Sequence, residues 1–410
     1  MHILHIYKDY APILGGIENH VRLLAEAQAA RGHRVTVLVT NPAGRRTTIT
    51  EESGVQVVRA ARLGTVVSTP LSLALPLQLS RIRPDLVHLH FPYPVGEVSQ
   101  WILRRGMATV LTYHSDVVRQ RRIMRFYRSV LVRVLARVDA IIVGSPPMQE
   151  SSYLQAYRSK LRLIPYGIPL ARFREPPSTG DRSRLASTYR EALDRNAESR
   201  AFGGAGSRAF GGAESRAGAE ARSRVSGGAP GECLLLFVGR LRYYKGLDNL
   251  IRALPGIPAR LLVVGAGPME EEWKALAVDT GVSDKIAWLG EVPDADLPAF
   301  YHLVDLFVLP ASHSSEAFGL VQVEAMAAGL PVVCTELGTG TSYVNQHGVT
   351  GLVVPPADAD ALRDAVNRLI ADPELRRSMG AAARIRASEF DLDVMVHRVL
   401  EMYRDVMRDA

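Results

Sequence analysis

The sequence predicts an α/β protein with two Rossmann-like domains, each built around a parallel sheet. Short apolar segments alternate with helical patterns along residues 1–175, and the same alternation resumes along residues 233–388. Short apolar strands of this kind are typical of parallel sheets whose faces are both covered by helices. A length of 410 residues also exceeds that of a typical single domain, which favours two.

Strands of the first domain, residues 1–175, are expected at short runs of apolar residues. These runs are His2–Tyr7, Arg34–Thr40, Val55–Ala60, Leu86–His90, Thr109–Tyr113, Ala140–Val143 and Leu161–Ile164. Between them, Glu18–Ala30 and Arg119–Val138 have the apolar periodicity of helices.

The second domain, residues 233–388, repeats this pattern. Its expected strands are Leu234–Val238, Arg260–Val264, Lys285–Leu289, Leu306–Leu309, Val332–Cys334 and Gly351–Val353, and its helices begin near Gly246, Met269, Asp296, Leu320 and Asp358. Residues 389–410 contain a last helix, about Asp391 to Arg408, that is long enough to pack back onto the first domain. In such folds the ligand is expected between the domains, at the carboxyl ends of the strands.

Residues 178–232 differ sharply from both domains. Ser199–Ala205 is repeated at once as Ser207–Ala213, and glycine, alanine, serine and arginine dominate the segment. A composition with so few core-forming residues predicts a disordered, flexible insert near the interdomain linker. RNA binding by its arginines is the alternative, but the many acids in the segment favour a solvated spacer.

The overall composition is that of a globular protein with a sizeable core, since 47% of the residues are apolar. The only cysteines, Cys233 and Cys334, belong to no metal-binding or disulfide pattern, which fits a reducing cytoplasm. The first residues resemble a strand rather than a secretory signal, and the apolar run from Val66 to Leu79 is broken by prolines. We therefore expect a cytoplasmic protein that at most lies on the inner face of a membrane.

The net charge of +7 has an uneven distribution along the chain. Residues 101–140 are rich in arginine, and in the expected helix from Arg119 to Arg137 the arginines share one half of the helical wheel, opposite apolar residues. This arrangement favours an anionic partner and suits a helix lying on anionic lipid. The alternative is an ordinary helix that packs its apolar face on the sheet. Both hold if only the arginines touch headgroups.

Two glycine-containing turns are candidate phosphate sites. Gly15 and Gly16 precede the first helix and allow close approach to a helix N-terminus, although an ordinary turn explains them as well. In the loop Val238–Gly246, Arg240 and Lys245 place a planar and a compact cation after a strand, which suits a diphosphate. Solvated surface cations are the alternative there.

His114 directly follows an expected strand at the edge where ligand is expected, with Asp116 two residues further on. An imidazole at this position can bind a sugar hydroxyl or polarise a reacting group. A structural histidine explains the position equally well.

Glu316 and Glu324 flank the sequence Ala-Phe-Gly-Leu-Val-Gln-Val. If Phe318–Gly319 is the turn into a helix, one acid lies outside the helix N-terminus and the other about one turn inside. A sugar nucleotide along this helix start would offer hydroxyls to the carboxylates and oxygens to the backbone amides.

Three Asp-x-Asp triplets resemble metal sites but are better explained as helix caps. They are Asp294–Asp296, Asp358–Asp360 and Asp391–Asp393, and each precedes a helical pattern. We therefore predict no metal and no cofactor.

Together these segments resemble the retaining glycosyltransferases of family 4, which have the GT-B fold with two Rossmann-like domains facing a central cleft. The resemblance covers nearly the whole chain apart from 178–232. It rests on Gly15–Gly16, on Val238–Gly246 and above all on the block from Glu316 to Gly329.

The resemblance implies a role for each matching residue. Glu324 would hold the ribose, while Glu316 and the amides of Phe318, Gly319 and Leu320 would face the transferred sugar. Arg240 and Lys245 would neutralise the diphosphate beside Gly16, and His114 would contact the donor sugar.

Two segments depart from the family pattern. Tyr166-Gly-Ile-Pro169 stands where members often have Asn-Gly-Val-Asp, and Gly338–Tyr343 lacks the usual proline and acid of the Gly-Gly-x-Pro-Glu loop. Neither departure removes a proposed site residue.

The expected function is transfer of a hexose, of mannose or glucose type, from a UDP- or GDP-sugar to an acceptor hydroxyl. A lipid-linked or envelope saccharide is the expected acceptor, and no nucleic acid is expected as a partner. Two alternatives stay open: a sugar-nucleotide epimerase on the same architecture, and a nucleotide-sugar-binding protein without catalysis.

Overall fold

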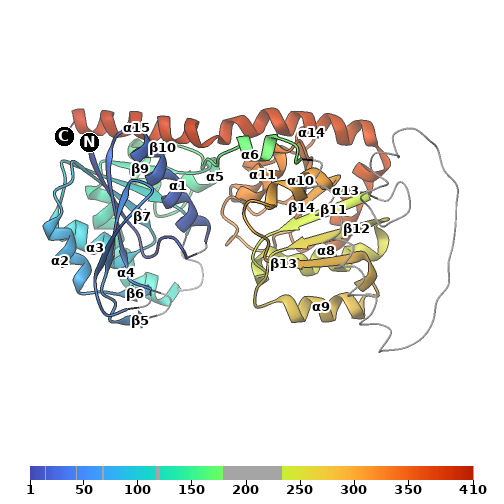
Figure 1. Cartoon of the computed structure of the whole chain (residues 1–410), viewed down its shortest axis with the longest axis horizontal. Coiled ribbons are helices and arrows are strands. Elements are labelled where there is room, and N and C mark those ends of the chain that lie inside the picture. The colour runs from blue at the N-terminus through green and yellow to red at the C-terminus, as the bar shows by residue number, and fades with distance from the viewer. Residues whose placement is uncertain (14, 43, 67–68, 117–120, 179–232, 410) are drawn as a thin grey trace, which may run out of the picture. The chain divides into compact units, whose positions relative to one another are not determined.

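The computed structural model describes residues 1–13, 15–42, 44–66, 69–116, 121–178 and 233–409, without the side chains of 121–126 (Figure 1). The chain forms two compact units, Met1–Pro169 with Glu389–Ala410 and Leu170–Ser388. The expected spacer at 178–232 lies almost entirely outside the described residues.

The first unit is built on an eight-stranded sheet in the order β10-β9-β8-β7-β1-β2-β4-β3. All neighbours are parallel except β3 and β4, which pair antiparallel. The strands are β1 (His2–Ile6), β2 (Arg34–Thr40), β3 (Thr48–Glu52), β4 (Val55–Ala60), β7 (Leu86–Phe91), β8 (Ala108–Tyr113), β9 (Ala140–Val143) and β10 (Leu161–Leu163), with a separate hairpin of β5 (Gly64–Val66) and β6 (Thr69–Leu71).

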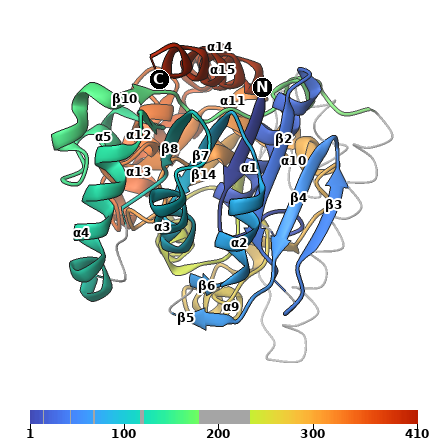
Figure 2. The same cartoon turned by 90° about the vertical axis from the view of Figure 1, so that its left-hand side faces the viewer.

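Helices cover both faces of this sheet (Figure 2). They are α1 (Gly16–Ala30), α2 (Ala74–Arg81), α3 (Pro94–Leu103), α4 (Arg121–Arg137), the short α5 (Pro146–Gln149) and α15 (Leu392–Arg408). The helix α15 buries Met395, Val399 and Tyr403 in a core shared with strand residues such as Ile3 and Val110. Residues 389–410 therefore belong to the first unit although they follow the second in sequence.

The second unit has a six-stranded sheet in the order β13-β12-β11-β14-β15-β16, parallel throughout. Its strands are β11 (Cys233–Val238), β12 (Ala259–Val264), β13 (Ile286–Gly290), β14 (Leu306–Leu309), β15 (Val332–Thr335) and β16 (Gly351–Val354). In order of sequence this is 3-2-1-4-5-6, the Rossmann arrangement, in which ligands bind where the strand order reverses, here between β11 and β14. In the first unit the order reverses between β1 and β7.

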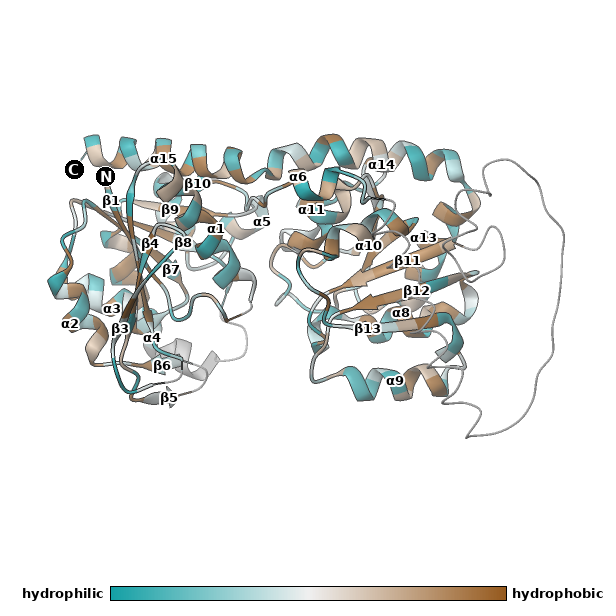
Figure 3. Ribbon diagram, in the orientation of Figure 1, coloured by the Kyte–Doolittle hydropathy of each residue, from teal (hydrophilic) through white to brown (hydrophobic). Residues whose placement is uncertain are grey.

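Helices of the second unit also lie on both faces of its sheet, whose strands are mostly apolar (Figure 3). They are α6 (Ala171–Arg174), α8 (Leu247–Ala253), α9 (Glu270–Asp279), α10 (Leu297–Leu303), α11 (Leu320–Ala327), α12 (Thr341–Val344), α13 (Ala359–Ala371) and α14 (Pro373–Ala387). Side chains of α8, α9 and α13 enclose one core with β11 and β12, including the fully buried Trp273 and Phe237.

The fold class predicted from the sequence is confirmed, because the chain has two parallel Rossmann-like sheets covered by helices. Every strand expected from the sequence is present, with bounds that differ by one residue at most. No strand was predicted at β3, β5 or β6, and no helix at α2, α3, α5, α6, α12 or α14. The contacts also place residues 170–175 in the second unit, whereas the sequence assigned them to the first.

The expected arginine-rich helix is present as α4, although Arg119 lies outside the described residues. Its Leu131 and Leu135 are fully buried, so the apolar face packs in the core. Arg128, Arg133 and Arg137 are exposed. Among the described residues, no helix combines the length and apolar character that crossing a bilayer requires.

Candidate functional site

A buried ion pair lies at the carboxyl end of the strands in the second unit. Lys245 ends the turn after β11, Glu316 lies in the loop after β14, and their Nζ and Oε2 atoms are 2.7 Å apart. Each side chain is about 10% exposed. Burial lowers the pKa of the Lys245 ammonium, but the Glu316 carboxylate outweighs burial and raises it. Both residues were predicted as site residues from the sequence, and in the structure they lie together where the strand order reverses.

Glycines allow the Lys245 turn to pack closely against neighbouring loops. Gly246 has a φ of +66°, and a Cβ at this position would lie 2.0 Å from Pro310 O. Gly239 has a φ of +151°, and a Cβ there would lie 3.3 Å from Lys245 Nζ. Only glycine fits both positions without strain. Arg240 follows Gly239 and is exposed, so its guanidinium is accessible to an anion.

The turn predicted at Phe318–Gly319 is the start of α11. Gly319 precedes the helix with a φ of +74°, and a Cβ there would lie 2.7 Å from Gln322 Nε2. The Phe318 ring is buried against Gly340. The backbone amides at the start of a helix have no partner within it, so the first amides of α11, from Leu320, are suited to bind oxygen atoms.

Glu324 lies one turn inside α11, as predicted. Its Oε2 accepts a hydrogen bond of 2.6 Å from the Tyr301 hydroxyl. Burial raises the pKa of Glu324 to about 7, although the Tyr301 hydrogen bond and the Arg172 guanidinium oppose burial. Hydroxyl groups that donate hydrogen bonds to a carboxyl group with this pKa stabilise its ionised form.

In the first unit, His114 lies beyond the end of β8 and is 3% exposed. Its Nε2 is 3.1 Å from His90 Nδ1, and its Nδ1 is 3.0 Å from the Tyr166 hydroxyl. Burial, with a smaller contribution from His20, lowers the pKa of His114 well below its ordinary value. The imidazole is therefore neutral and already hydrogen-bonded at both nitrogens.

The neighbouring Asp116 has a structural role. Its Oδ1 accepts hydrogen bonds from the Tyr113 hydroxyl at 2.6 Å and from Ser151 Oγ at 2.8 Å. The carboxylate thus binds the hydroxyls of Tyr113 and Ser151 rather than His114.

Gly15 and Gly16 begin α1 and differ in their surroundings. A Cβ on Gly15 would lie 2.0 Å from Glu18 Oε2, so a side chain there would displace this buried acid. A Cβ on Gly16 would meet no described atom within 4 Å. Packing explains the first glycine, and the space beside Gly16 is open to a ligand.

The Asp-x-Asp triplets are capping groups in two cases of three. Asp358 Oδ1 accepts from Ala361 N at 2.9 Å, and Asp391 Oδ1 accepts from Asp393 N at 2.8 Å. The prediction is wrong for the first triplet, because Asp296 makes no side-chain capping bond and Asp294 pairs with Arg172 instead.

Among the described residues, two histidine groups have ligand atoms close enough to hold a metal ion. They are His5, His88 and His90, and His20, His90 and His114, with nitrogens within 4.8 Å of one another. Histidine–histidine hydrogen bonds of 3.0 and 3.1 Å already join His5 to His90 and His90 to His114. Hydrogen bonding therefore accounts for His5, His90 and His114, whereas both ring nitrogens of His20 are buried without a hydrogen-bond partner among the described residues.

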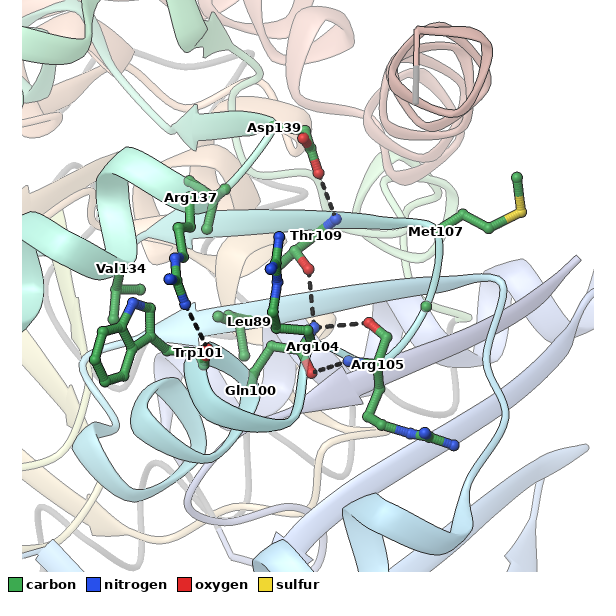
Figure 4. Close-up of a pocket in the computed structure, with 12 residues that line it drawn as sticks. Leu89, Gln100, Trp101, Arg104, Arg105, Met107, Thr109, Val134, Arg137 and Asp139 are labelled. Carbon is green, nitrogen blue, oxygen red and sulfur yellow. Dashed lines mark hydrogen bonds between the residues drawn. The ribbon is translucent and has the colours of Figure 1, made fainter.

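A cavity of about 290 Å³ lies at the opposite edge of the first sheet, where β8 and β9 begin (Figure 4). Its polar groups bind one another: Arg137 donates to Trp101 O at 3.0 Å, and Asp139 accepts from Thr109 N at 2.7 Å. No residue predicted as a site residue lines it.

Three residues at these sites were not predicted as site residues from the sequence. They are Tyr301 beside Glu324, and His90 and Tyr166 beside His114. For Tyr166 a signal existed, since it occupies a position that is often asparagine in the family pattern. No signal pointed to Tyr301 or His90, because their partners lie far away in sequence.

Comparison with known families assigns both halves of the chain. Residues 14–172 match the model described as Glycosyltransferase Family 4, and residues 220–386 match Glycosyl transferases group 1. The D-rhamnosyltransferase WbpZ of Pseudomonas aeruginosa is 34% identical over 393 residues, which cover 94% of this chain and 91% of that protein. The chain therefore belongs to glycosyltransferase family 4 and is an enzyme of that class.

Two further proteins agree with this assignment. The O-antigen chain mannosyltransferase C of Escherichia coli is 31% identical, and the match covers 99% of both chains. The structure of sucrose-phosphate synthase from Thermosynechococcus elongatus superposes with a TM-score of 0.75 at 24% identity, over 100% of both chains. The latter likeness shows the GT-B fold.

Proposed function

We propose that this enzyme transfers a hexose from a nucleotide diphosphate sugar to an acceptor hydroxyl with retention of configuration. The observation that carries the proposal is Lys245, a buried cation held by Glu316 in a glycine-lined turn where the strand order of the second sheet reverses. A departing diphosphate gains negative charge as the glycosidic bond breaks. A fixed cation beside it stabilises that charge without reorganisation.

Four predicted site residues of the second unit, and the start of α11, have a part in this proposal. Glu324, with its pKa of about 7, accepts hydrogen bonds from the ribose hydroxyls. Arg240 joins Lys245 at the diphosphate. Glu316 aims Lys245, while the first amides of α11, from Leu320, bind sugar oxygens.

In the proposed reaction one bond to the anomeric carbon breaks and another forms. The bond from the anomeric carbon to the phosphate oxygen breaks, and its electron pair goes to the leaving diphosphate. The acceptor oxygen forms the new bond on the same face of the sugar, and its proton passes to the leaving phosphate. His114 contacts the donor sugar, and Gly16 lies beside the diphosphate. No metal ion takes part in this proposal.

The names of the two relatives favour a donor sugar of mannose type, since one transfers mannose and the other D-rhamnose. A thermal-shift screen of UDP- and GDP-sugars tests the donor, because a ligand bound to the folded state raises the melting temperature. Stabilisation by no sugar nucleotide would contradict the proposal.

Incubation without an acceptor separates this function from the two alternatives. A transferase releases sugar only by slow hydrolysis, an epimerase converts the donor, and a binding protein leaves it intact. Lys245→Ala should mainly slow transfer, whereas Glu324→Ala should mainly weaken nucleotide binding.

We also propose that the acceptor is a lipid-linked or envelope saccharide, met at the inner face of a membrane. The exposed Arg128 and Arg133 of α4, opposite its buried apolar face, support this. Flotation with anionic vesicles tests it: Arg128→Glu with Arg133→Glu should weaken binding, and Arg252→Glu on α8 serves as the control. Absence of flotation at low salt would contradict the proposal that the enzyme meets its acceptor at a membrane.

A further inference from the structure

An unbroken hydrogen-bonded chain leads from the core of the first unit to His114. Gln28 Oε1 lies 2.7 Å from His5 Nε2, and His5 Nδ1 lies 3.0 Å from His90 Nε2. His90 Nδ1 is 3.1 Å from His114 Nε2, and His114 Nδ1 is 3.0 Å from the Tyr166 hydroxyl. Every nitrogen of the three imidazoles is used.

These rings are neutral because burial lowers the pKa of each, that of His5 to about 4. A neutral imidazole has one N–H donor and one acceptor nitrogen. The amide oxygen of Gln28 only accepts, so His5 donates from Nε2 and accepts at Nδ1. His90 must then donate from Nε2, and His114 must do the same. Tyr166 donates to the remaining acceptor, Nδ1 of His114.

The other side of Gln28 supports this direction. Its Nε2 donates to the Tyr403 hydroxyl at 3.5 Å, and that hydroxyl lies 2.5 Å from His88 Nδ1. With the amide in this orientation, both Tyr403 and Tyr166 donate to an imidazole nitrogen. The reversed amide would make both phenols accept from imidazole N–H groups. A phenol is the stronger acid and imidazole nitrogen the stronger acceptor, so the first orientation gives the better bonds.

His114 cannot change tautomer alone. If its proton moved to Nδ1, the lone pair of its Nε2 would face the lone pair of His90 Nδ1. Restoring the bond would require His90 and His5 to change as well, and His5 would then present a lone pair to the oxygen of Gln28.

We propose that Gln28, His5 and His90 are positioning residues that hold His114 as the Nε2–H tautomer, with Nδ1 as the acceptor for a hydroxyl. The kinetic consequence rests on the proposed function. A sugar hydroxyl that takes the place of the Tyr166 hydroxyl must donate to His114 Nδ1. The glutamine thus determines, through two imidazoles, which kind of hydrogen bond His114 offers.

Tyr166 is accommodated by its surroundings. A Cβ on Gly144 would lie 2.8 Å from the Tyr166 ring, and this ring stacks on His114 with a centroid distance of 5.5 Å. The residue that departs from the family pattern is therefore the one whose hydroxyl bonds to His114 Nδ1.

Nitrogen-15 NMR of imidazole side chains in the ligand-free full-length protein tests the tautomers without reference to activity. We expect His5, His90 and His114 to be Nε2–H tautomers at neutral pH. Gln28→Met should turn the His114 signal into a mixture, and Gln28→Glu, which keeps an acceptor oxygen, should preserve it. Gln100→Met is the matched control, because Gln100 is also buried but bonds to Arg105 and Thr109.

An Nδ1–H tautomer of His114 in the wild type would overturn the proposal, as would a Gln28→Met spectrum identical to that of the wild type. Nitrogen shifts typical of a metal-bound imidazole, with zinc present in the purified protein, would also overturn it in favour of a site at His20, His90 and His114.

Steady-state transfer from GDP-mannose gives the second readout. Gln28→Met should lower kcat about tenfold, the factor for one hydrogen bond lost in the transition state, and leave GDP affinity unchanged. Gln28→Glu should restore kcat. Unchanged kcat with an altered His114 tautomer would refute the positioning role. Lack of wild-type turnover with every donor would instead refute the proposed function and leave the NMR result standing.

Discussion

The ion pair between Lys245 and Glu316 can be tested by a double-mutant cycle. The variants are Lys245→Met, Glu316→Gln and the two combined, all close in shape to the native side chains. Each native side chain is only about 10% exposed, and the charged atoms are 2.7 Å apart. Each single variant therefore leaves one buried charge without its counter-charge.

An uncompensated buried charge costs about 3–5 kcal/mol of unfolding free energy. The double variant removes both charges and should lose less than the sum of the singles, with a coupling energy of about 3 kcal/mol. For a unit of this size, 1 kcal/mol corresponds to about 2–4 °C, so each single variant should lower the melting temperature by roughly 6–20 °C.

The assay is thermal unfolding followed by circular dichroism, with calorimetry to resolve the transition of the second unit. Single variants that each lose less than about 1 kcal/mol, or losses that add in the double variant, would refute the burial argument. A pH series gives a further check. Because the folded-state pKa of Lys245 is raised, the stability it contributes is complete below its usual value of 10.5 and falls as pH rises beyond it.

Three further predictions follow from other groups. Nucleotide binding should release a proton near pH 7, because hydrogen bonds from the ribose hydroxyls favour the ionised form of Glu324, whose pKa is about 7. Calorimetry in buffers of different ionisation enthalpy measures this proton release, and Glu324→Gln should abolish it. Gly246→Ala should cost about 3 kcal/mol in urea unfolding, whereas Gly281→Ala, with a similar φ of +71° but open space, should cost about 1 kcal/mol; equal losses would disprove the clash with Pro310. His20→Phe should raise the unfolding free energy by about 1 kcal/mol, because both His20 ring nitrogens are buried without a hydrogen-bond partner among the described residues. It should also lessen the loss of stability between pH 6.5 and about 3, where the unfolded His20 is protonated and the folded one is not; a destabilised variant in melting experiments would show that His20 is bonded after all.

Most of the fold follows from local sequence because the central strands are buried on both faces. Strands such as β11, which is buried throughout, appear as continuous apolar runs with clear ends. The edge strand β3 is almost fully exposed and polar, so its sequence carries no such run. It forms because β4 offers it an open edge, and the sequence of the segment does not encode that partner.

The candidate site shows the same division. Lys245 and Glu316 were recognised by residue type and by their place after strands, but their contact depends on two loops that only the sheet order brings together. The partners of His114 and Glu324 escaped prediction because a tyrosine hydroxyl carries no local signature of its acceptor. The positions of strands and helices can therefore be predicted from the sequence more completely than the contacts between side chains.

The helix α15 has a consequence for the synthesis of the protein. It completes the first unit, where Tyr403 bonds to His88, although the whole second unit is translated before it. On the ribosome, the second unit can finish folding while the first still exposes the apolar surface that Met395 and Val399 later cover. The first unit therefore completes its folding only after α15 has been translated. A fragment ending at residue 175 should aggregate unless α15 is supplied as a separate peptide.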